Sequence, residues 1–272
     1  MLQYPNINPV ALDLGVIQVH WYGLMYLFAF LCAWGLASYR AKQRDDWNTD
    51  MVSDLIFFGA LGVILGGRVG YVFFYGFEQF LANPLWLFQV WTGGMSFHGG
   101  FIGVMVAMIF WCRKYQKSWF ETLDFIAPCV PTGLMFGRIG NFIGGELYGR
   151  PVSDPNFIFG MIFPTDPLGL VRHPSQLYQA LCEGLILFIV LWWFSSKPRP
   201  RYAVSALFLI GYGIARFVIE FFRMPDNNQL FIAWMSKGQF LTLPMIFIGM
   251  WMLWYAYQKN IYDWQLKVSS VK

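Results

Sequence analysis

Long apolar blocks constrain this chain more than any other feature of its sequence. The clearest blocks are Trp21–Ser38, Leu55–Tyr75, Phe101–Cys112 and Leu185–Phe194. A helix in a soluble core seldom stays apolar on all of its faces for so long. Charged residues make up only 12% of the 272 positions, whereas a soluble domain usually carries about 25%. The sequence therefore predicts an all-α, polytopic membrane protein.

Turn residues and basic clusters divide the chain into about seven expected transmembrane helices. These lie at approximately 18–38, 52–75, 96–112, 120–140, 176–194, 203–222 and 239–257. Seven spans of about 20 residues need roughly 140 positions, which leaves too little chain for a separate soluble domain. We therefore expect a single transmembrane domain over 1–272, with a periplasmic cap or arm at about 141–175, where five prolines indicate irregular structure.

The basic clusters set the expected orientation. They follow the first, third, fifth and seventh spans, as Arg40/Lys42/Arg44, Arg113/Lys114/Lys117, Lys197/Arg199/Arg201 and Lys259/Lys267/Lys272. The positive-inside rule then predicts a periplasmic N-terminus and a cytoplasmic C-terminus. The net charge of +4 reflects this orientation, so we expect no nucleic-acid partner.

Several features argue against a cofactor or an exported soluble form. The first basic residue is Arg40, so we expect no cleavable signal peptide. The four cysteines are scattered and form no CxxC pair, which predicts neither a disulfide framework nor a zinc site. The sequence contains no metal-ligand motif and no nucleotide fingerprint. We therefore expect no metal and no cofactor.

Seven basic residues remain outside the cytoplasmic clusters, and they run against the charge rule. They are Arg68, Arg138, Arg150, Arg172, Arg216, Arg223 and Lys237. The planar guanidinium suits bidentate binding of phosphate, and a charge inside a membrane span is by default a candidate functional group. We favour function for Arg138 and Arg216. For Arg68 and Arg223 the structural and functional interpretations stand equal.

Three further constellations gather polar residues toward the outer membrane face, and the last of them indicates an anion site there. Tyr212, Arg216 and Glu220 follow each other at i, i+4 and i+8, so they share one helix face. His98 stands in the glycine-rich stretch 93–100, where bare backbone lets a ligand approach. The segment Gly137–Gly149 combines a cation, an amide and a carboxylate among glycines. Spacing alone specifies no reaction.

The segment Gly137–Gly149 resembles the signature of prolipoprotein diacylglyceryl transferases, G-R-x-G-N-F-x-N-x-E-x-x-G. One departure is Gly144, which stands where that pattern usually has Asn. The resemblance continues in the same order along the chain, through His20–Gly23, Gly66–Arg68, Gly94–Gly100, Arg172–Tyr178, Tyr212–Phe217, Glu220, Arg223 and Pro225–Asp226.

This resemblance implies an activity, two substrates and a location. Members of the family move the diacylglyceryl group of phosphatidylglycerol to the lipobox cysteine thiol of a prolipoprotein, which forms a thioether and releases glycerol phosphate. The implied location is the bacterial inner membrane, with the active site toward the periplasmic leaflet, and membrane lipids are the surrounding partners.

Roles for single residues follow from the resemblance. Arg138 should bind the phosphatidylglycerol headgroup, with Asn141 and Glu146 completing the pocket. Arg216, oriented by Glu220 and close to Tyr212, is the second candidate to hold the phosphate. His98 is the first candidate to accept the thiol proton, and Glu146 is the alternative. The expected lipid-binding set also contains Tyr22, Gly149 and Arg68.

Two functions of other classes compete with the transferase. A transporter or flippase would spread ionisable residues through the membrane depth, or show an internal repeat. A non-catalytic lipid-binding scaffold would need Arg138 but would have no use for His98.

Overall fold

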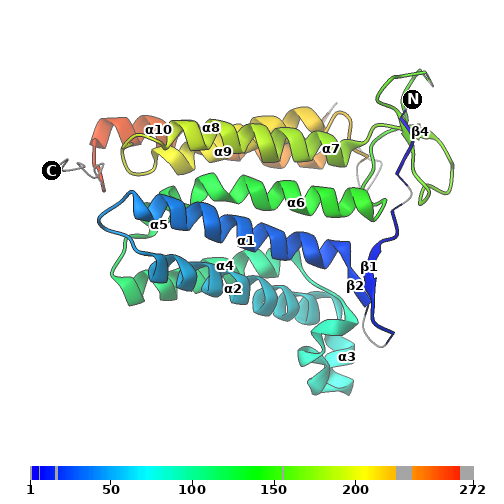
Figure 1. Cartoon of the computed structure of the whole chain (residues 1–272), viewed down its shortest axis with the longest axis horizontal. Helices are drawn as coiled ribbons and strands as arrows, with labels where there is room; N and C mark the ends of the chain where they lie inside the picture. Colours follow the sequence, from blue (N-terminus) through cyan, green and yellow to red (C-terminus); the bar gives the residue numbers. More distant parts are fainter. Residues whose placement is uncertain (1, 6, 16–17, 155, 225–234, 264–272) are drawn as a thin grey trace. The chain divides into compact units, whose positions relative to one another are not determined.

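Helices dominate the part of the chain that the structure describes. The computed structural model describes residues 2–5, 7–15, 18–154, 156–224 and 235–263. Figure 1 shows its α-helices, which are α1 (Trp21–Lys42), α2 (Thr49–Tyr75), α3 (Phe77–Ala82), α4 (Phe97–Tyr115), α5 (Trp119–Ile126), α6 (Val130–Ile143), α7 (Ser175–Gln179), α8 (Leu187–Phe194), α9 (Ala203–Ile219) and α10 (Lys237–Lys259). A π-helix, Ala180–Ile186, joins α7 to α8. Pro225, Asp226, Lys267 and Lys272 lie outside the described residues.

Four helical segments are long and apolar enough to cross a membrane. They are α1, α2, the continuous segment Ser175–Phe194 and α10. Each of the seven stretches predicted as a span contains helix, and a mainly helical membrane protein is confirmed, although the described residues also include the short strands β1 to β4. The count of seven crossings and the orientation of the termini stay predictions.

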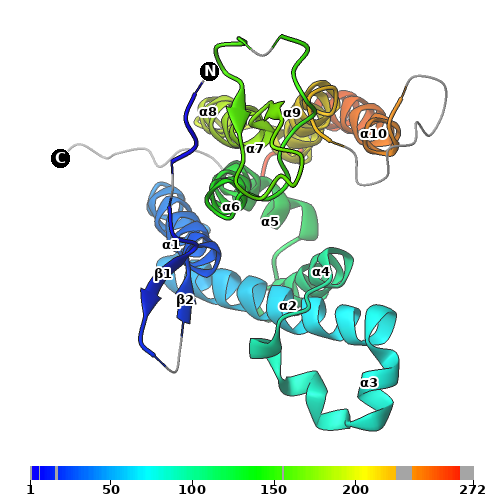
Figure 2. The same ribbon diagram turned by 90° about the vertical axis from the view of Figure 1, so that its right-hand side faces the viewer.

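Three local features differ from the sequence-based expectation. The first helix begins at Trp21 because Gln18–His20 (β2) pairs with Val10–Asp13 (β1) as an antiparallel hairpin, which Figure 2 shows beside α1. The stretch expected as one span at 120–140 is interrupted by a 3₁₀ turn at Ala127–Cys129, where Pro128 lacks a backbone donor. The loop after α2 holds α3 and two 3₁₀ helices, Pro84–Phe88 and Val90–Thr92, which were not predicted.

The helices group into two compact units, of which the first comprises the described residues of 1–36 and 123–266. It contains the hairpin and α6 to α10. An apolar cluster of Ala127, Leu187, Leu191 and Val204 lies at its core. Gly184 lets the π-helix approach α6 closely, since a Cβ atom there would lie 2.6 Å from the Cβ of Met135. The turn of the π-helix that follows Gln179 is therefore held against the helix that carries Arg138.

The second unit comprises residues 37–122, in which α2 packs on α4 through glycines. A Cβ atom on Gly66 would lie 2.3 Å from the carbonyl oxygen of Gly99, and one on Gly103 would lie 2.1 Å from that of Gly62. No side chain fits at such distances, so the backbones of the two helices touch directly. Glycines four positions apart on each helix, Gly62 and Gly66 on α2 and Gly99 and Gly103 on α4, allow this close approach.

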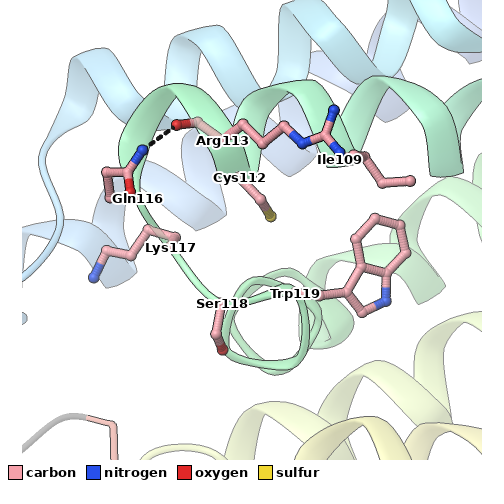
Figure 3. A pocket seen from close by; sticks show the side chains of 7 residues that line it. All are labelled: Ile109, Cys112, Arg113, Gln116, Lys117, Ser118 and Trp119. Carbon is pink, nitrogen blue, oxygen red and sulfur yellow. Dashed lines mark hydrogen bonds between the residues drawn. The ribbon is translucent and has the colours of Figure 1, made fainter.

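A hollow opens in the second unit between the end of α4 and the start of α5 (Figure 3). Its volume is about 520 Å³, and its lining residues are Ile109, Cys112, Arg113, Gln116, Lys117, Ser118 and Trp119. Lys117 forms ion pairs with Asp46 at 2.9 Å and Glu121 at 2.6 Å. The hollow contains none of the residues expected at the lipid site.

The segment after α6 is mostly irregular, and an ion pair between two of its own residues stabilises it. Its strands β3 (Met161–Ile162) and β4 (Val171–Arg172) have two residues each. The Arg172 guanidinium donates to both oxygens of Asp166, at 2.7 and 3.0 Å, and both side chains are buried. The carboxylate also accepts from the backbone of Leu168 and Leu170. Arg172 is thus a structural residue of this arm.

Candidate functional site

A cluster of buried charges forms where α6, the π-helix and α9 meet. Arg138 of α6 interacts electrostatically with Glu183 of the π-helix and with Tyr212, Arg216 and Arg223 on or just after α9. All of these belong to the first unit. The structure therefore brings together the two arginines that the sequence favoured as functional.

Arg216 is held between two carboxylates. Its Nη1 lies 3.6 Å from Oε1 of Glu183, and its Nη2 lies 3.4 Å from Oε2 of Glu220. Both separations exceed a hydrogen bond of about 3 Å, so the guanidinium is oriented without being saturated. The Nη1 atom of Arg223 lies 3.7 Å from Oε1 of Glu220, so this carboxylate faces two arginines. The Tyr–Arg–Glu stripe expected on this helix does face the interior of its unit.

The glycine-rich signature begins on α6 and turns back beside it. Arg138 Nη1 donates to Oδ1 of Asn141 at 3.3 Å. The backbone N–H of Glu146 donates to the carbonyl of Asn141 at 2.9 Å, which closes the turn. Gln176 fixes the same segment by donating to the carbonyl of Glu146 at 2.5 Å. Asn141 is buried and Glu146 is exposed, so the carboxylate remains available to a substrate.

Gly144, the departure from the family pattern, lies under the Glu146 side chain. A Cβ atom at this position would lie 3.0 Å from Oε1 of Glu146. An asparagine in this place would therefore contact that carboxylate. Glycine here leaves the carboxylate without such a neighbour.

Tyr22 belongs beside the signature segment. Its ring packs over Gly140, whose Cβ would lie 3.1 Å from the tyrosine Cδ2. The phenol interacts electrostatically with Glu146 and Arg138. Its hydroxyl lies 3.3 Å from that of Tyr26. This location is compatible with contact between Tyr22 and a headgroup at Arg138.

Gly149 has a packing role. A Cβ atom there would lie 2.5 Å from the carbonyl oxygen of Phe222 and 2.6 Å from that of His173. The Gly149 N–H donates to the same His173 carbonyl at 2.8 Å. The residue joins three chain segments by their backbones, and its expected place in the lipid-binding set stays a prediction.

Arg68 in the second unit is fully engaged with its own loop. Its side chain is buried, and its guanidinium lies 4.5 Å from the Trp86 ring. The guanidinium donates to the carbonyls of Trp86, Leu87, Gly93 and Gly94 and to the hydroxyl of Thr92. Of the two interpretations of Arg68, this bonding favours the structural one.

His98 lies in the first turn of α4, in the second unit. Ser96 caps this helix by accepting from Gly99 at 3.3 Å. The imidazole is exposed and packs edge-on against Phe97. Its exposure leaves it accessible to a substrate thiol.

The other histidines differ from His98 in their surroundings. His173 packs against the rings of Phe157, Phe222 and Tyr178. Burial among these rings lowers its pKa below the ordinary value, because the imidazolium loses hydration there. His20 is exposed at the end of the hairpin. Within the described ranges no group of three His, Cys, Asp or Glu side chains could hold a metal ion.

Sequence reasoning assigned no role to two buried polar residues of this site. Gln179 and Glu183 are fully buried and lie four positions apart on the helical segment. Neither side chain has a hydrogen-bond partner among the described residues. The sequence does single out Glu183, because it is the one charged residue of the apolar segment Ser175–Phe194. An ionisable residue inside a span is expected to be functional.

Comparisons with known proteins show the family of this chain. The family model for prolipoprotein diacylglyceryl transferase matches residues 9–255. The chain belongs to the prolipoprotein diacylglyceryl transferase family. Curated relatives named phosphatidylglycerol–prolipoprotein diacylglyceryl transferase include one from Acinetobacter baumannii strain ACICU, 80% identical over 97% of this chain and 98% of the relative. Another, from Psychrobacter arcticus, is 59% identical over 97% of this chain and 98% of the relative.

Proposed function

We propose that the arginine cluster of this transferase, which contains Arg138 and Arg216, holds the phosphate of phosphatidylglycerol. The diacylglyceryl group of that lipid moves to a prolipoprotein cysteine while the phosphate is held. Family membership and the names of the relatives support the reaction and its two substrates. The observation that carries the site is the convergence of Arg138 and Arg216, whose present partners lie no closer than 3.3 Å. Both guanidiniums therefore keep donors for a phosphate.

The reaction balances with one base and one leaving group. The cysteine sulfur attacks the glyceryl carbon that bears the phosphate ester, so a C–S bond forms and the C–O bond breaks. The electron pair leaves on the phosphate oxygen, and glycerol phosphate departs. Arginines in a site of low dielectric stabilise this developing charge. The thiol proton passes to the base.

His98 is the first candidate for that base, and Glu146 is the alternative. A free thiol has a pKa of about 8.5, so a base is needed near neutral pH. Both side chains are exposed. The substitution His98→Gln should leave lipid binding roughly intact and abolish thioether formation, whereas retained turnover would remove His98 as the base.

The remaining parts of the proposal concern position in the membrane. We place the N-terminus in the periplasm, the C-terminus in the cytoplasm and the active site toward the periplasmic leaflet of the inner membrane. The basic residues after the odd-numbered expected spans support this orientation. Labelling of single cysteines introduced at 154 and 259, with a reagent that cannot cross the membrane, tests it. Only the position 154 cysteine should react in intact spheroplasts.

Transfer to a synthetic lipobox peptide from phosphatidylglycerol tests the function. The protein in detergent is compared with Arg138→Ala, and the mass of the peptide reports its lipidation. Product from the unsubstituted protein alone would support both the reaction and the headgroup site. A well-folded protein that gives no product, under conditions where a relative is active, would favour the flippase.

A further inference from the structure

We propose that Glu183 is a positioning residue that orients Arg216 and limits the net charge of the phosphate site. This inference rests on the proposed function of the arginine cluster. It concerns how that cluster is kept ready for a phosphodiester and how it releases the product.

The Glu183 carboxylate is buried next to positively charged side chains. Its side chain is 0% exposed, and neither carboxylate oxygen has a hydrogen-bond partner among the described residues. A carboxylate in this state is costly unless opposite charge lies nearby. The Arg216 guanidinium at 3.6 Å supplies that charge, and Arg138 and Arg223 also interact with the carboxylate electrostatically.

The backbone around Glu183 is arranged to place it there. Residues Ala180–Ile186 form a π-helix, which widens one turn and changes the direction of the side chains that follow; such insertions are frequent at functional sites. Gly184, the next residue, allows the contact with Met135 of α6 described above. A larger residue at 184 would move the π-helix away from the helix that carries Arg138. The sequence therefore places Glu183 against two helices at once.

The geometry separates the role of Glu183 from that of Glu220. The two carboxylates contact different terminal nitrogens of Arg216, at 3.6 and 3.4 Å. Glu220 is also bound by the hydroxyl of Ser236 at 3.2 Å. The two carboxylates thus contact the Arg216 guanidinium through different nitrogens, and together they fix the orientation of its plane. With Glu183 neutralised, only the Glu220 contact would orient it.

Glu183 lowers the positive charge of the cluster around Arg216 by one unit. Among the described residues, its arginines outnumber its glutamates by one, with Arg138, Arg216 and Arg223 opposed by Glu183 and Glu220. Phosphatidylglycerol carries one negative charge, whereas the glycerol phosphate product carries about −1.5 to −2, as phosphomonoesters do. With Glu183 ionised, the site retains this product less strongly than it would if the carboxylate were absent. Glu183 therefore serves orientation and product release together.

The test compares Glu183→Gln with Glu183→Asp in the peptide-transfer assay. For Glu183→Gln we expect kcat to fall on the order of 100-fold, as for a displaced catalytic group, with KM for phosphatidylglycerol unchanged or lower. Inhibition by added glycerol phosphate should strengthen roughly tenfold, because the site gains one unit of positive charge. Glu183→Asp keeps the charge, so it should retain the wild-type inhibition constant and recover part of kcat.

Asp124→Asn is the matched control. Asp124 is another carboxylate of the first unit, and it accepts from the backbone of Tyr202 and from the N–H and hydroxyl of Ser205. Ser205 precedes Arg216 by eleven helical positions, about 16 Å along the axis. Asn at 124 should lower the thermal midpoint and leave kcat and the inhibition constant unchanged.

The outcomes separate the possibilities. Equal loss of kcat in Glu183→Gln and Asp124→Asn, or an unchanged inhibition constant in Glu183→Gln, would overturn the proposal. If Glu183→Gln does not fold, stronger product inhibition in Glu183→Asp would overturn it, since that variant keeps the charge. Absence of product from the unsubstituted protein would count against the proposed function itself.

Discussion

The Asp166–Arg172 ion pair gives the sharpest stability prediction. Substitution Asp166→Ala leaves the Arg172 guanidinium buried without its carboxylate, with 2% of its side chain exposed. Breaking a buried pair in this way costs about 3–5 kcal/mol. Two backbone donors, on Leu168 and Leu170, also lose their acceptor. For a chain of this size we expect the thermal midpoint to fall by about 10 °C.

Buried thiols provide the assay. The thiols of Cys112 and Cys129 are buried, so a thiol-reactive dye reports unfolding as the detergent-solubilised protein is heated. Asp154→Ala, at an exposed carboxylate of the same arm, is the control and should leave the midpoint unchanged. The double substitution Asp166→Ala/Arg172→Met removes both charges and should be more stable than Asp166→Ala alone. A double variant as unstable as the single one would refute the orphaned charge as the cause.

The same pair predicts a pH dependence. The Arg172 guanidinium holds the pKa of the Asp166 carboxyl below its usual range. A carboxyl whose folded pKa is depressed contributes stability above its unfolded pKa of about 3.9, and this stability is lost as the pH falls through the folded value. The difference in midpoint between the wild type and Asp166→Ala should therefore be full at pH 7 and shrink below about pH 4. A difference that stayed constant to lower pH would contradict this assignment.

Three further substitutions test the site and its packing. Arg216→Lys should lower kcat by about 100-fold or more, although the positive charge is retained. The single ammonium of lysine cannot contact two carboxylates and a phosphate at once. The peptide-transfer assay measures this loss of kcat. Gly103→Leu should abolish assembly of α2 with α4, since even its Cβ would lie 2.1 Å from the Gly62 carbonyl, and the yield of monodisperse protein reports this. Gly144→Asn should fold normally and change kcat alone, because only the flexible Glu146 side chain must move; equal thermal midpoints with altered turnover are expected.

Much of the helical layout was predictable, because bilayer thickness fixes the length of an apolar span. The positions of Arg138 and Arg216 on inward faces also followed from charge and spacing. The break at Ala127–Cys129 has a local cause in Pro128, and it was missed because the residues on both sides remain apolar. The helices of 77–92 were missed because they are short, and the 3₁₀ helix Pro84–Phe88 is bound by Arg68, a partner outside the loop.

The least predictable element of the site is the π-helix. Apolar residues on both sides of Glu183 indicate a helix of some kind, but the insertion depends on packing between Gly184 and Met135. Such a contact between distant segments has no signature in a local pattern. The role of Glu183 therefore required its neighbours to be known, whereas Arg138 could be found from its glycine-rich surroundings alone.

The bonding of Arg68 has a consequence for how loss-of-function variants of this family are interpreted. One guanidinium supports the loop that leads to Ser96 and His98, through four carbonyls and a hydroxyl. An Arg68 variant would lose this support of the loop, and with it product formation, whether or not Arg68 also contacts lipid. A screen scored by growth or product alone would group it with Arg138 and Arg216. Lipid-binding measurements would separate a supporting residue from the residues it supports.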